Sequence, residues 1–370
     1  MSAFKKLALA ATAVALFAGQ AMAQDKVVNV YNWSDYIDPT VLDSFTKETG
    51  IKVVYDTMDS NEVLETKLYA GNTGYDVVVP SNLNLKREIA HDVLQPLDKS
   101  KIPDLKYAWD KVTTPLQAYD PGNKYAVNYM WGTTGIGYNV DKAKKIMGDK
   151  PMNTWDVVFN PDVISKFADC GVYFLDSPDD IIPSAMRYLG LPPDSKDPQD
   201  IAKAAKLLQS VSKYVKKFHS SEYINALANG DICLVIGYSG DIIQAKSRAA
   251  DAHTKTPDKP LVDISYVIPK EGALMWFDSM VIPKDAPHVE EAHAFINYMM
   301  RPEIAAKNSS FLGYANGNLE SQKSVSPDVL NDKSIYPDDA TIASLFTTTP
   351  ADAKAQKLWT RTWTKIKTGQ

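Results

Sequence analysis

Hydrophobic and polar positions follow two alternating patterns along the N-terminal part of the chain. Short apolar or β-branched runs predict strands, and stretches with apolar residues three and four apart predict helices. The predicted strands are 27–31, 51–55 and 76–79, and the predicted helices are 39–49 and 60–70. The strand at 76–79 is apolar at consecutive positions, which is typical of a sheet covered on both faces. Strands alternating with helices at this spacing predict parallel β-α-β units.

A second series of the same kind begins after residue 170. Its predicted elements are strands at 172–175 and 232–236, an apolar segment at 181–189 and a helix at 200–212. Residues 125–140, which carry three glycines among β-forming residues, are expected to cross from the first series to the second, and residues 262–269 to return. The remaining predictions are a strand at 275–282 and helices at 289–300, 302–309 and 351–366.

The two series together predict an α/β protein with two lobes. A chain of 370 residues exceeds the size at which single hydrophobic cores stop growing, so two units are expected. We expect residues 24–131 and 268–312 to form the first lobe, and residues 132–267 and 313–370 the second. Ligands of open α/β sheets bind at the carboxyl ends of the strands, which places a ligand cleft between the lobes, with hinge crossovers that allow closure.

The first 23 residues have the pattern of a cleaved secretory signal peptide. Lys5 and Lys6 precede an apolar run from Leu7 to Phe17 that is too short to span a bilayer, and small residues stand at Ala21 and Ala23. The alternatives are a buried N-terminal helix and a membrane anchor. The mature chain is therefore predicted to begin near Gln24 as an exported, soluble protein.

Composition narrows the class of partner. The chain carries a formal net charge of −5, with 23% charged residues and no basic run, which argues against nucleic acid as a partner. A mildly acidic balance is compatible with a cationic ligand, although net charge alone is weak support. Cys170 and Cys233 are the two cysteines, and an even pair in an exported protein indicates a disulfide, with two buried free thiols as the alternative.

Catalytic and metal-binding motifs are incomplete or absent in the sequence. Residues 237–241 begin like a nucleophile elbow but end in Asp rather than Gly, and residues 135–137 lack the third glycine of a dinucleotide-binding loop. The histidines show no metal-ligand spacing; they are His91, His219, His253, His288 and His293. We therefore predict a binding protein with neither cofactor nor metal, and keep a secreted α/β hydrolase as an alternative.

Three aromatic residues lie close to carboxylates near the ends of predicted strands. The pairs are Trp33 with Asp35, Tyr238 with Asp241 and Trp276 with Asp278. Aromatic faces attract ammonium groups, and carboxylates form charge-assisted hydrogen bonds with them. A diamine needs an anionic partner at each end and an apolar wall between, which such pairs supply. The alternative for any one pair is a core aromatic beside a surface or capping aspartate.

Longer motifs carry a resemblance to a known family. Residues 31–37, YNWSDYI, resemble the ligand-binding turn of periplasmic polyamine-binding proteins, particularly the putrescine-binding type. The resemblance continues through the whole mature chain at 45–53, 59–62, 75–81, 130–139, 218–221, 227–233 and 268–273. It implies a type II periplasmic-binding fold, a periplasmic location, a monomer and an inner-membrane ABC permease as partner.

The resemblance also implies which residues form the site. The family's cleft residues fall on Trp33, Ser34, Asp35, Tyr36, Ser81, Asp180, Tyr238, Asp241, Trp276, Asp278 and Tyr314. Asp278 and Asp35 are expected to take ammonium groups or waters, and Trp33, Tyr238, Trp276 and Tyr314 to form an aromatic box. The positions of Cys170 and Cys233 also match a disulfide of the family.

Several positions depart from the family pattern. The family often has Glu at Asp180, Trp or Tyr at Tyr238 and Phe at Trp276, and residues 82–85 are unlike the putrescine type. A shorter carboxylate and a larger ring change the length of the cleft. Putrescine is the first expectation, with cadaverine, agmatine and spermidine left open, and an amino acid or a sugar as further alternatives.

Overall fold

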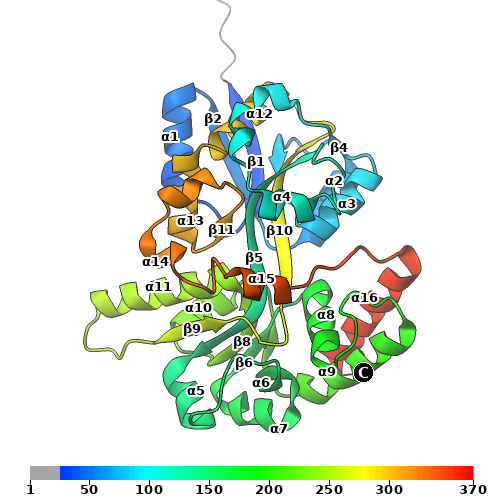
Figure 1. Ribbon diagram of the computed structural model, residues 1–370, viewed down its shortest axis with the longest axis vertical. Coiled ribbons are helices and arrows are strands. Elements are labelled where there is room, and N and C mark those ends of the chain that lie inside the picture. The colour runs from blue at the N-terminus through cyan, green and yellow to red at the C-terminus, as the bar shows by residue number, and fades with distance from the viewer. Residues whose placement is uncertain (1–25, 370) are drawn as a thin grey trace, which may run out of the picture.

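The computed structural model describes residues 26–369, so the predicted signal peptide lies outside the described residues. Within that range, helices alternate with strands in two lobes, one above the other in Figure 1. No helix among the described residues combines the length and apolar character needed to cross a membrane.

The first series of elements runs to the long strand that leaves the upper lobe of Figure 1. It comprises β1 (Val27–Trp33), α1 (Pro39–Thr49), β2 (Lys52–Met58), α2 (Asn61–Ala70), β3 (Val77–Val78), α3 (Asn82–Ala90), β4 (Leu94–Gln95), α4 (Asp110–Leu116) and β5 (Ala126–Asn139). The predicted helix at 39–49 is confirmed at both ends. It begins there because the Asp38 side chain accepts from the Thr40 amide and Pro39 fits the first turn, and it ends at Gly50, whose φ is 72°.

The second series builds the lower lobe. It comprises α5 (Val140–Met147), α6 (Asp156–Phe159), α7 (Pro161–Ile164), β6 (Val172–Phe174), α8 (Pro178–Tyr188), α9 (Pro198–Ser212), β7 (Lys217–Phe218), α10 (Tyr223–Ala228), β8 (Leu234–Tyr238), α11 (Ser239–Lys255) and β9 (Ile264–Val267). The chain then returns through β10 (Leu274–Pro283), α12 (Val289–Met299), α13 (Pro302–Leu312), β11 (Ala315–Asn316), α14 (Pro327–Leu330), α15 (Asp339–Ser344) and α16 (Ala353–Thr368).

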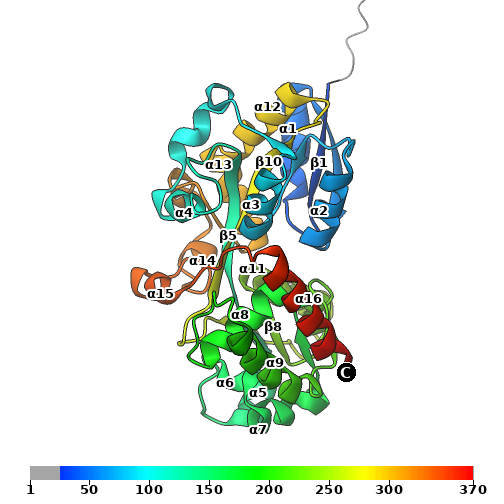
Figure 2. The same ribbon diagram turned by 90° about the vertical axis from the view of Figure 1, so that its right-hand side faces the viewer.

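One sheet passes through both lobes. Its main path is β2-β1-β3-β10-β5-β8-β6-β7, with β4, β9 and β11 paired beside it. The strand pairs β1–β2, β1–β3, β6–β7 and β6–β8 are parallel, as the β-α-β pattern predicts. The antiparallel pair β5–β10 joins the two halves and runs between the lobes in Figures 1 and 2.

Helices cover both faces of the first-lobe sheet. Val77 and Val79 of the β3 region pack in the hydrophobic cluster that contains Phe45 of α1 and Phe295 of α12. Val78 points the other way and packs with Leu64 of α2. The apolar run at these positions therefore serves two buried faces, as a covered parallel strand requires.

The second lobe has a core of its own. That cluster includes Trp155, Ile182 and Val235, and α16 closes over it with Trp359 and Trp363. Cys170 and Cys233 form a disulfide with their Cα atoms 5.6 Å apart, as the sequence predicted. The bond ties the end of the segment before β6 to the residue before β8, so it lies within one lobe.

Two features differ from the predicted crossovers. Residues 262–269 do not carry the chain back: β9 pairs with the β5 residues Ile136–Asn139, and β10 makes the return crossing beside β5. Residues after 312 were expected in the second lobe, yet Val325, Val329 and Tyr336 pack in the first-lobe cluster with Leu64. The final helix packs with the second core, and Leu345 packs against both cores. The boundaries of the lobes as moving units stay a prediction.

Candidate ligand-binding cleft

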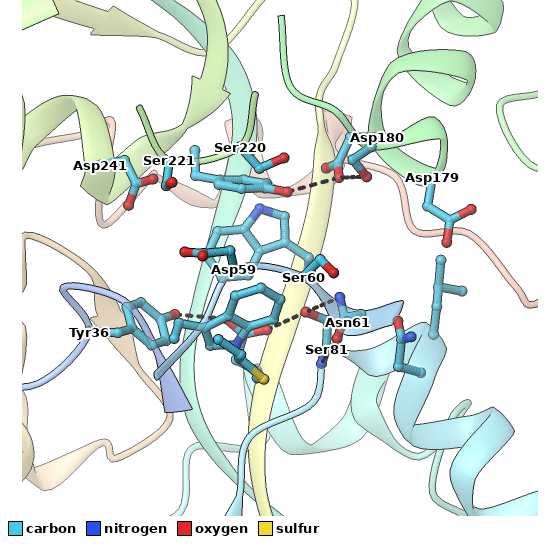
Figure 3. Close-up of a pocket in the computed structure, with 18 of the residues that line it drawn as sticks. Tyr36, Asp59, Ser60, Asn61, Ser81, Asp179, Asp180, Ser220, Ser221 and Asp241 are labelled. Atoms are coloured by element: carbon cyan, nitrogen blue, oxygen red, sulfur yellow. Dashed lines mark hydrogen bonds between the residues drawn. The ribbon is translucent and has the colours of Figure 1, made fainter. Parts of the chain in front are cut away.

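A cavity of about 120 Å³ lies between the two lobes. Its walls come from the segments that follow β1, β2 and β3 in the first lobe, from the segments after β6 and β8 in the second, and from β10. The segments after β1, β2, β3, β6 and β8 follow the carboxyl ends of strands that have parallel neighbours, which is where ligands of such sheets bind. The antiparallel strand β10 contributes residues from within the strand. Figure 3 shows Tyr36 and Ser81 on the first-lobe side, with Asp180 and Asp241 facing them from the second.

The structure brings ten of the eleven predicted site residues into this cavity. They are Trp33, Ser34, Tyr36, Ser81, Asp180, Tyr238, Asp241, Trp276, Asp278 and Tyr314. Asp35 does not line it. Its carboxylate instead binds Arg248 of α11 at 2.9 Å, and its side chain is about half exposed. Asp35, at φ 54°, directs its carboxylate to Arg248, and its expected role in taking an ammonium group or a water stays a prediction.

Asp278 is buried at the first-lobe side of the cavity. Ser81 Oγ donates to one carboxylate oxygen at 2.6 Å, and the Tyr36 hydroxyl donates to the other at 2.9 Å. Burial raises the pKa of Asp278 to about 7, and the two hydroxyl donors oppose that rise. The hydrogen bonds fix both oxygens without neutralising the charge of the ionised carboxylate.

Asp180 has the same kind of environment in the second lobe. It accepts hydrogen bonds from Thr134 at 2.5 Å, Ser177 at 2.6 Å and Tyr238 at 3.2 Å. Burial raises its pKa, and the three hydroxyl donors act in the opposite direction. Asp180 lies in the first turn of α8, where the helix dipole favours a negative charge.

Asp241 is the third carboxylate of the wall that hydroxyl groups hold, and it is partly buried. The hydroxyls of Tyr223 and Tyr314 each donate to it at 2.6 Å. Tyr314 belongs to the first-lobe core and Asp241 to α11, so this bond crosses from one lobe to the other. Burial raises the pKa of Asp241 to about 6.

Aromatic side chains line the cavity between these carboxylates. Trp276 packs edge-to-face on Tyr238 and on Tyr314, with ring centroids 5.6 Å apart in each case. Trp33 is fixed by its indole N–H, which donates to the Val79 carbonyl at 2.9 Å. The Tyr36 ring meets that of Tyr314 edge-on at 5.1 Å. The predicted aromatic residues therefore meet in one place, although they come from four separate parts of the chain.

The charges of the cavity wall have one sign. Seven of the lining residues are acidic, and no lining residue in the described part of the chain is basic; the acids are Asp59, Glu62, Asp176, Asp179, Asp180, Asp241 and Asp278. Despite these acids, residues 26–369 contain no group of three or more His, Cys, Asp or Glu placed to hold a metal ion. Carboxylates spread around aromatic rings can bind an extended organic cation by charge-assisted hydrogen bonds and cation–π contacts.

Comparisons with known proteins agree with this geometry. Residues 40–337 match the family model described as bacterial extracellular solute-binding protein. The chain belongs to this family. Members of the family are solute-binding proteins rather than enzymes, which agrees with the predicted class.

The similar proteins cover essentially the whole chain. The putrescine-binding periplasmic protein SpuD of Pseudomonas aeruginosa (strain UCBPP-PA14) is 51% identical over 100% of both chains. The putrescine-binding periplasmic protein PotF of Escherichia coli (strain K12) is 45% identical over 98% of this chain and 97% of its own. This solute-binding protein is accordingly assigned to the periplasm.

A solved structure shows the same fold. The spermidine/putrescine ABC transporter substrate-binding protein PotD from Streptococcus pneumoniae, in complex with calcium and HEPES, superposes with a TM-score of 0.75. It is 31% identical in sequence and covers 93% of this chain and 99% of its own. The two-lobed periplasmic-binding fold predicted for this solute-binding protein is confirmed.

Sequence reasoning missed four of the acidic residues in the wall. Asp59 and Glu62 lie at the start of α2, and Asp176 and Asp179 at the start of α8. Acidic residues are common at helix N-termini, where they cap the helix or interact with its dipole. The sequence therefore gave no reason to assign these four residues to the cleft. The position of the two helices in the sequence could have identified these residues. Both helices follow strands of the sheet, so their N-termini lie at the edge of the sheet where the cleft is.

Asn61 is a further residue that the sequence did not single out. Its side chain donates to Ser81 Oγ at 3.2 Å and accepts from the Ser81 amide at 3.1 Å. Ser81 in turn donates to Asp278. Asn61 thereby orients the hydroxyl that holds the Asp278 carboxylate in place.

Proposed function

We propose that this periplasmic solute-binding protein captures a polyamine in the cleft, putrescine before others, and delivers it to an inner-membrane ABC permease. The observation that carries the proposal is the cavity wall: three carboxylates held by hydroxyl donors, two of them buried, with an aromatic box between them. The described residues that line the wall include acidic side chains and no basic ones. The names of SpuD, PotF and PotD, which bind putrescine or spermidine and putrescine, support the same ligand class.

The proposed roles follow from the positions of the side chains. Asp278 binds one ammonium group from the first lobe, and Asp180 and Asp241 bind from the second. Trp33, Tyr238, Trp276 and Tyr314 enclose the methylene chain between the charged ends and add cation–π attraction. Ser34, Tyr36 and Ser81 complete the first-lobe wall.

Capture proceeds by closure of the lobes. The ligand would contact Asp278 in one lobe and Asp180 in the other only when the cleft is closed, so binding favours the closed state. The closed form then presents both lobes to the permease. The protein is expected to act as a monomer and to have no affinity for nucleic acid.

The deciding experiment is calorimetric titration of the mature protein, freed of ligand by unfolding and refolding. Putrescine, cadaverine, agmatine and spermidine are compared with butylamine, which has one ammonium group, and with 1,4-butanediol, which has none. We expect heat with the diamines and much weaker or no binding of the two control compounds. A folded, ligand-free protein that releases no heat with any diamine or triamine would contradict the proposal.

An amino acid or a sugar is the second candidate, because aromatic boxes also bind sugars. Both are included as further titrants in the same series. If the protein binds an amino acid or a sugar more tightly than any polyamine, binding that ligand class is its function instead.

A further inference from the structure

Asp179, at the outer end of the cleft, differs from the neighbouring Asp180. Asp180 accepts three hydroxyl hydrogen bonds. No side chain or backbone group among residues 26–369 donates a hydrogen bond to the Asp179 carboxylate, and its ion-pair partner is Arg87, whose Nη1 lies 4.0 Å away. Figure 3 shows Asp179 directed away from Asp180 at the side of the pocket.

Arg87 reaches Asp179 from the opposite lobe. It belongs to α3, and its Nε donates to Glu65 of α2 at 2.7 Å, so the guanidinium is held in place from the first lobe. Its side chain is 19% exposed and that of Asp179 is 22% exposed, which limits the screening of their charges by water. The positive charge of Arg87 is therefore fixed at the boundary between the lobes.

Two cavities meet at this point. Leu83, Asp179 and Thr348 line both the cleft and a smaller cavity, and Arg87 lines only the smaller one. Arg87 is thus a wall residue of the cavity that adjoins the cleft at Asp179, and Lys196 lines the same cavity. Glu62 is close enough for its charge to act on Asp179, so two carboxylates face this end of the cleft.

We infer that Arg87 closes the outer end of the cleft with a fixed positive charge and thereby selects diamines over longer triamines. The inference rests on the proposed function. An extended triamine needs anionic partners for a third ammonium group, and Asp179 with Glu62 are the carboxylates placed to supply them. In this protein the guanidinium already partly occupies that position, and two positive charges a few ångströms apart repel each other. Arg87 is thus a specificity-determining residue that leaves the diamine subsite untouched.

The test compares putrescine with spermidine in wild type and in Arg87→Gln, by calorimetry. Glutamine removes the charge and keeps a donor for Glu65. We expect wild type to prefer putrescine, and the variant to bind spermidine at least about tenfold better relative to putrescine, which corresponds to gaining one charge-assisted contact. The change should come from tighter spermidine binding than in wild type, with the putrescine affinity kept. A misfolded variant cannot show such a gain, so the result remains interpretable if the variant is less stable.

Arg248→Gln is the matched control. Arg248 is also an arginine that pairs with an aspartate of the other lobe, Asp35, but it does not line either cavity. Its loss should change the affinities for both amines by the same factor. The double variant Arg87→Gln/Asp179→Asn should lose the gain in spermidine affinity, because the carboxylate that accepts the third ammonium group is gone.

Three results would overturn the inference while leaving the proposed function intact. They are an unchanged spermidine-to-putrescine ratio in Arg87→Gln, a double variant that keeps the gain, and an equal change of the ratio in Arg248→Gln, which would assign the effect to lobe closure. A wild type that prefers spermidine would overturn both the inference and the proposed preference for putrescine, and would leave the capture of a polyamine intact. A wild type that binds neither amine would overturn the proposed function and the inference together.

Discussion

Hydroxyl groups, rather than basic side chains, are the hydrogen-bond donors of Asp278, Asp180 and Asp241. A buried carboxylate without a positive partner is costly, and its pKa rises in consequence. Serine, threonine and tyrosine donors hold the oxygens in place but leave the charge uncompensated. The site is therefore built to be completed by a cation from outside.

Replacing one of these carboxylates by its amide measures how much its negative charge contributes to cation binding. We expect Asp278→Asn to weaken putrescine binding by more than about tenfold, because one charge-assisted contact is lost while the shape of the side chain is kept. Calorimetry gives the affinity. Asp43→Asn, on the exposed side of α1, removes the same charge far from the cavity wall and should bind like wild type. Wild-type affinity in Asp278→Asn would remove Asp278 from the site.

The raised pKa of Asp278 predicts a dependence on pH. The folded, ligand-free protein holds a proton on this carboxyl up to about pH 7, whereas the unfolded chain releases it near the ordinary pKa of about 4. The folded state therefore binds more protons in this window, and stability of the ligand-free protein falls as the pH rises through it. Putrescine remains a dication there and binds the ionised form, so its affinity rises over the same range.

Thermal unfolding at pH of about 5.5 and about 8.5, with and without putrescine, checks both signs. The stabilisation by ligand should be larger at the higher pH. Asp278→Asn should reduce the difference between the two conditions. A ligand effect that is the same at both pH values, or larger in acid, would mean that the cleft carboxylates are already ionised in the empty protein.

At the scale of elements, the sequence predicted where strands end more accurately than it predicted the directions of the side chains that follow them. The Trp33 and Tyr238 pairs were found because their strands could be recognised and parallel strands end at one edge. Trp276 and Asp278 lie within the antiparallel strand β10, which reaches the cleft as it crosses between the lobes. Asp35 was expected to take an ammonium group, yet it does not line the cavity, because the direction of a turn side chain depends on a partner, Arg248, that is more than two hundred residues away. Glu62 and Asp179 were missed because helix N-termini commonly carry acids for local reasons.

The start of α11 provides an element-scale prediction. Gly240 lies beneath the Tyr314 ring, and a Cβ built there would overlap the ring carbons. Gly240→Ala should push Tyr314 away from Asp241 and from Trp276, and so weaken putrescine binding while leaving both lobes folded. Calorimetry combined with circular dichroism checks this. A folded variant with unchanged affinity would show that the position of the Tyr314 ring does not matter for binding.

At the scale of the molecule, the disulfide lies within the second lobe and not at the cleft. It joins residues 63 apart in sequence, and a loop of this size gives about 4 kcal/mol of stabilisation in the chain-entropy model. Cys170→Ser/Cys233→Ser should lower the denaturant midpoint of unfolding and leave the putrescine affinity of the folded protein nearly unchanged. Equal midpoints with and without the bond, or a large loss of affinity, would contradict this separation of stability from binding.

The sheet that passes through both lobes also decides how the protein can be divided. Separating the protein into two fragments along the β5–β10 pairing would leave each fragment with a long strand whose backbone groups are unpaired on one side. Such exposed strand edges pair with other chains. Neither half is expected to be a usable fragment when produced alone. Insertions that report on ligand capture, such as a fluorescent domain, therefore belong in surface turns away from these two strands.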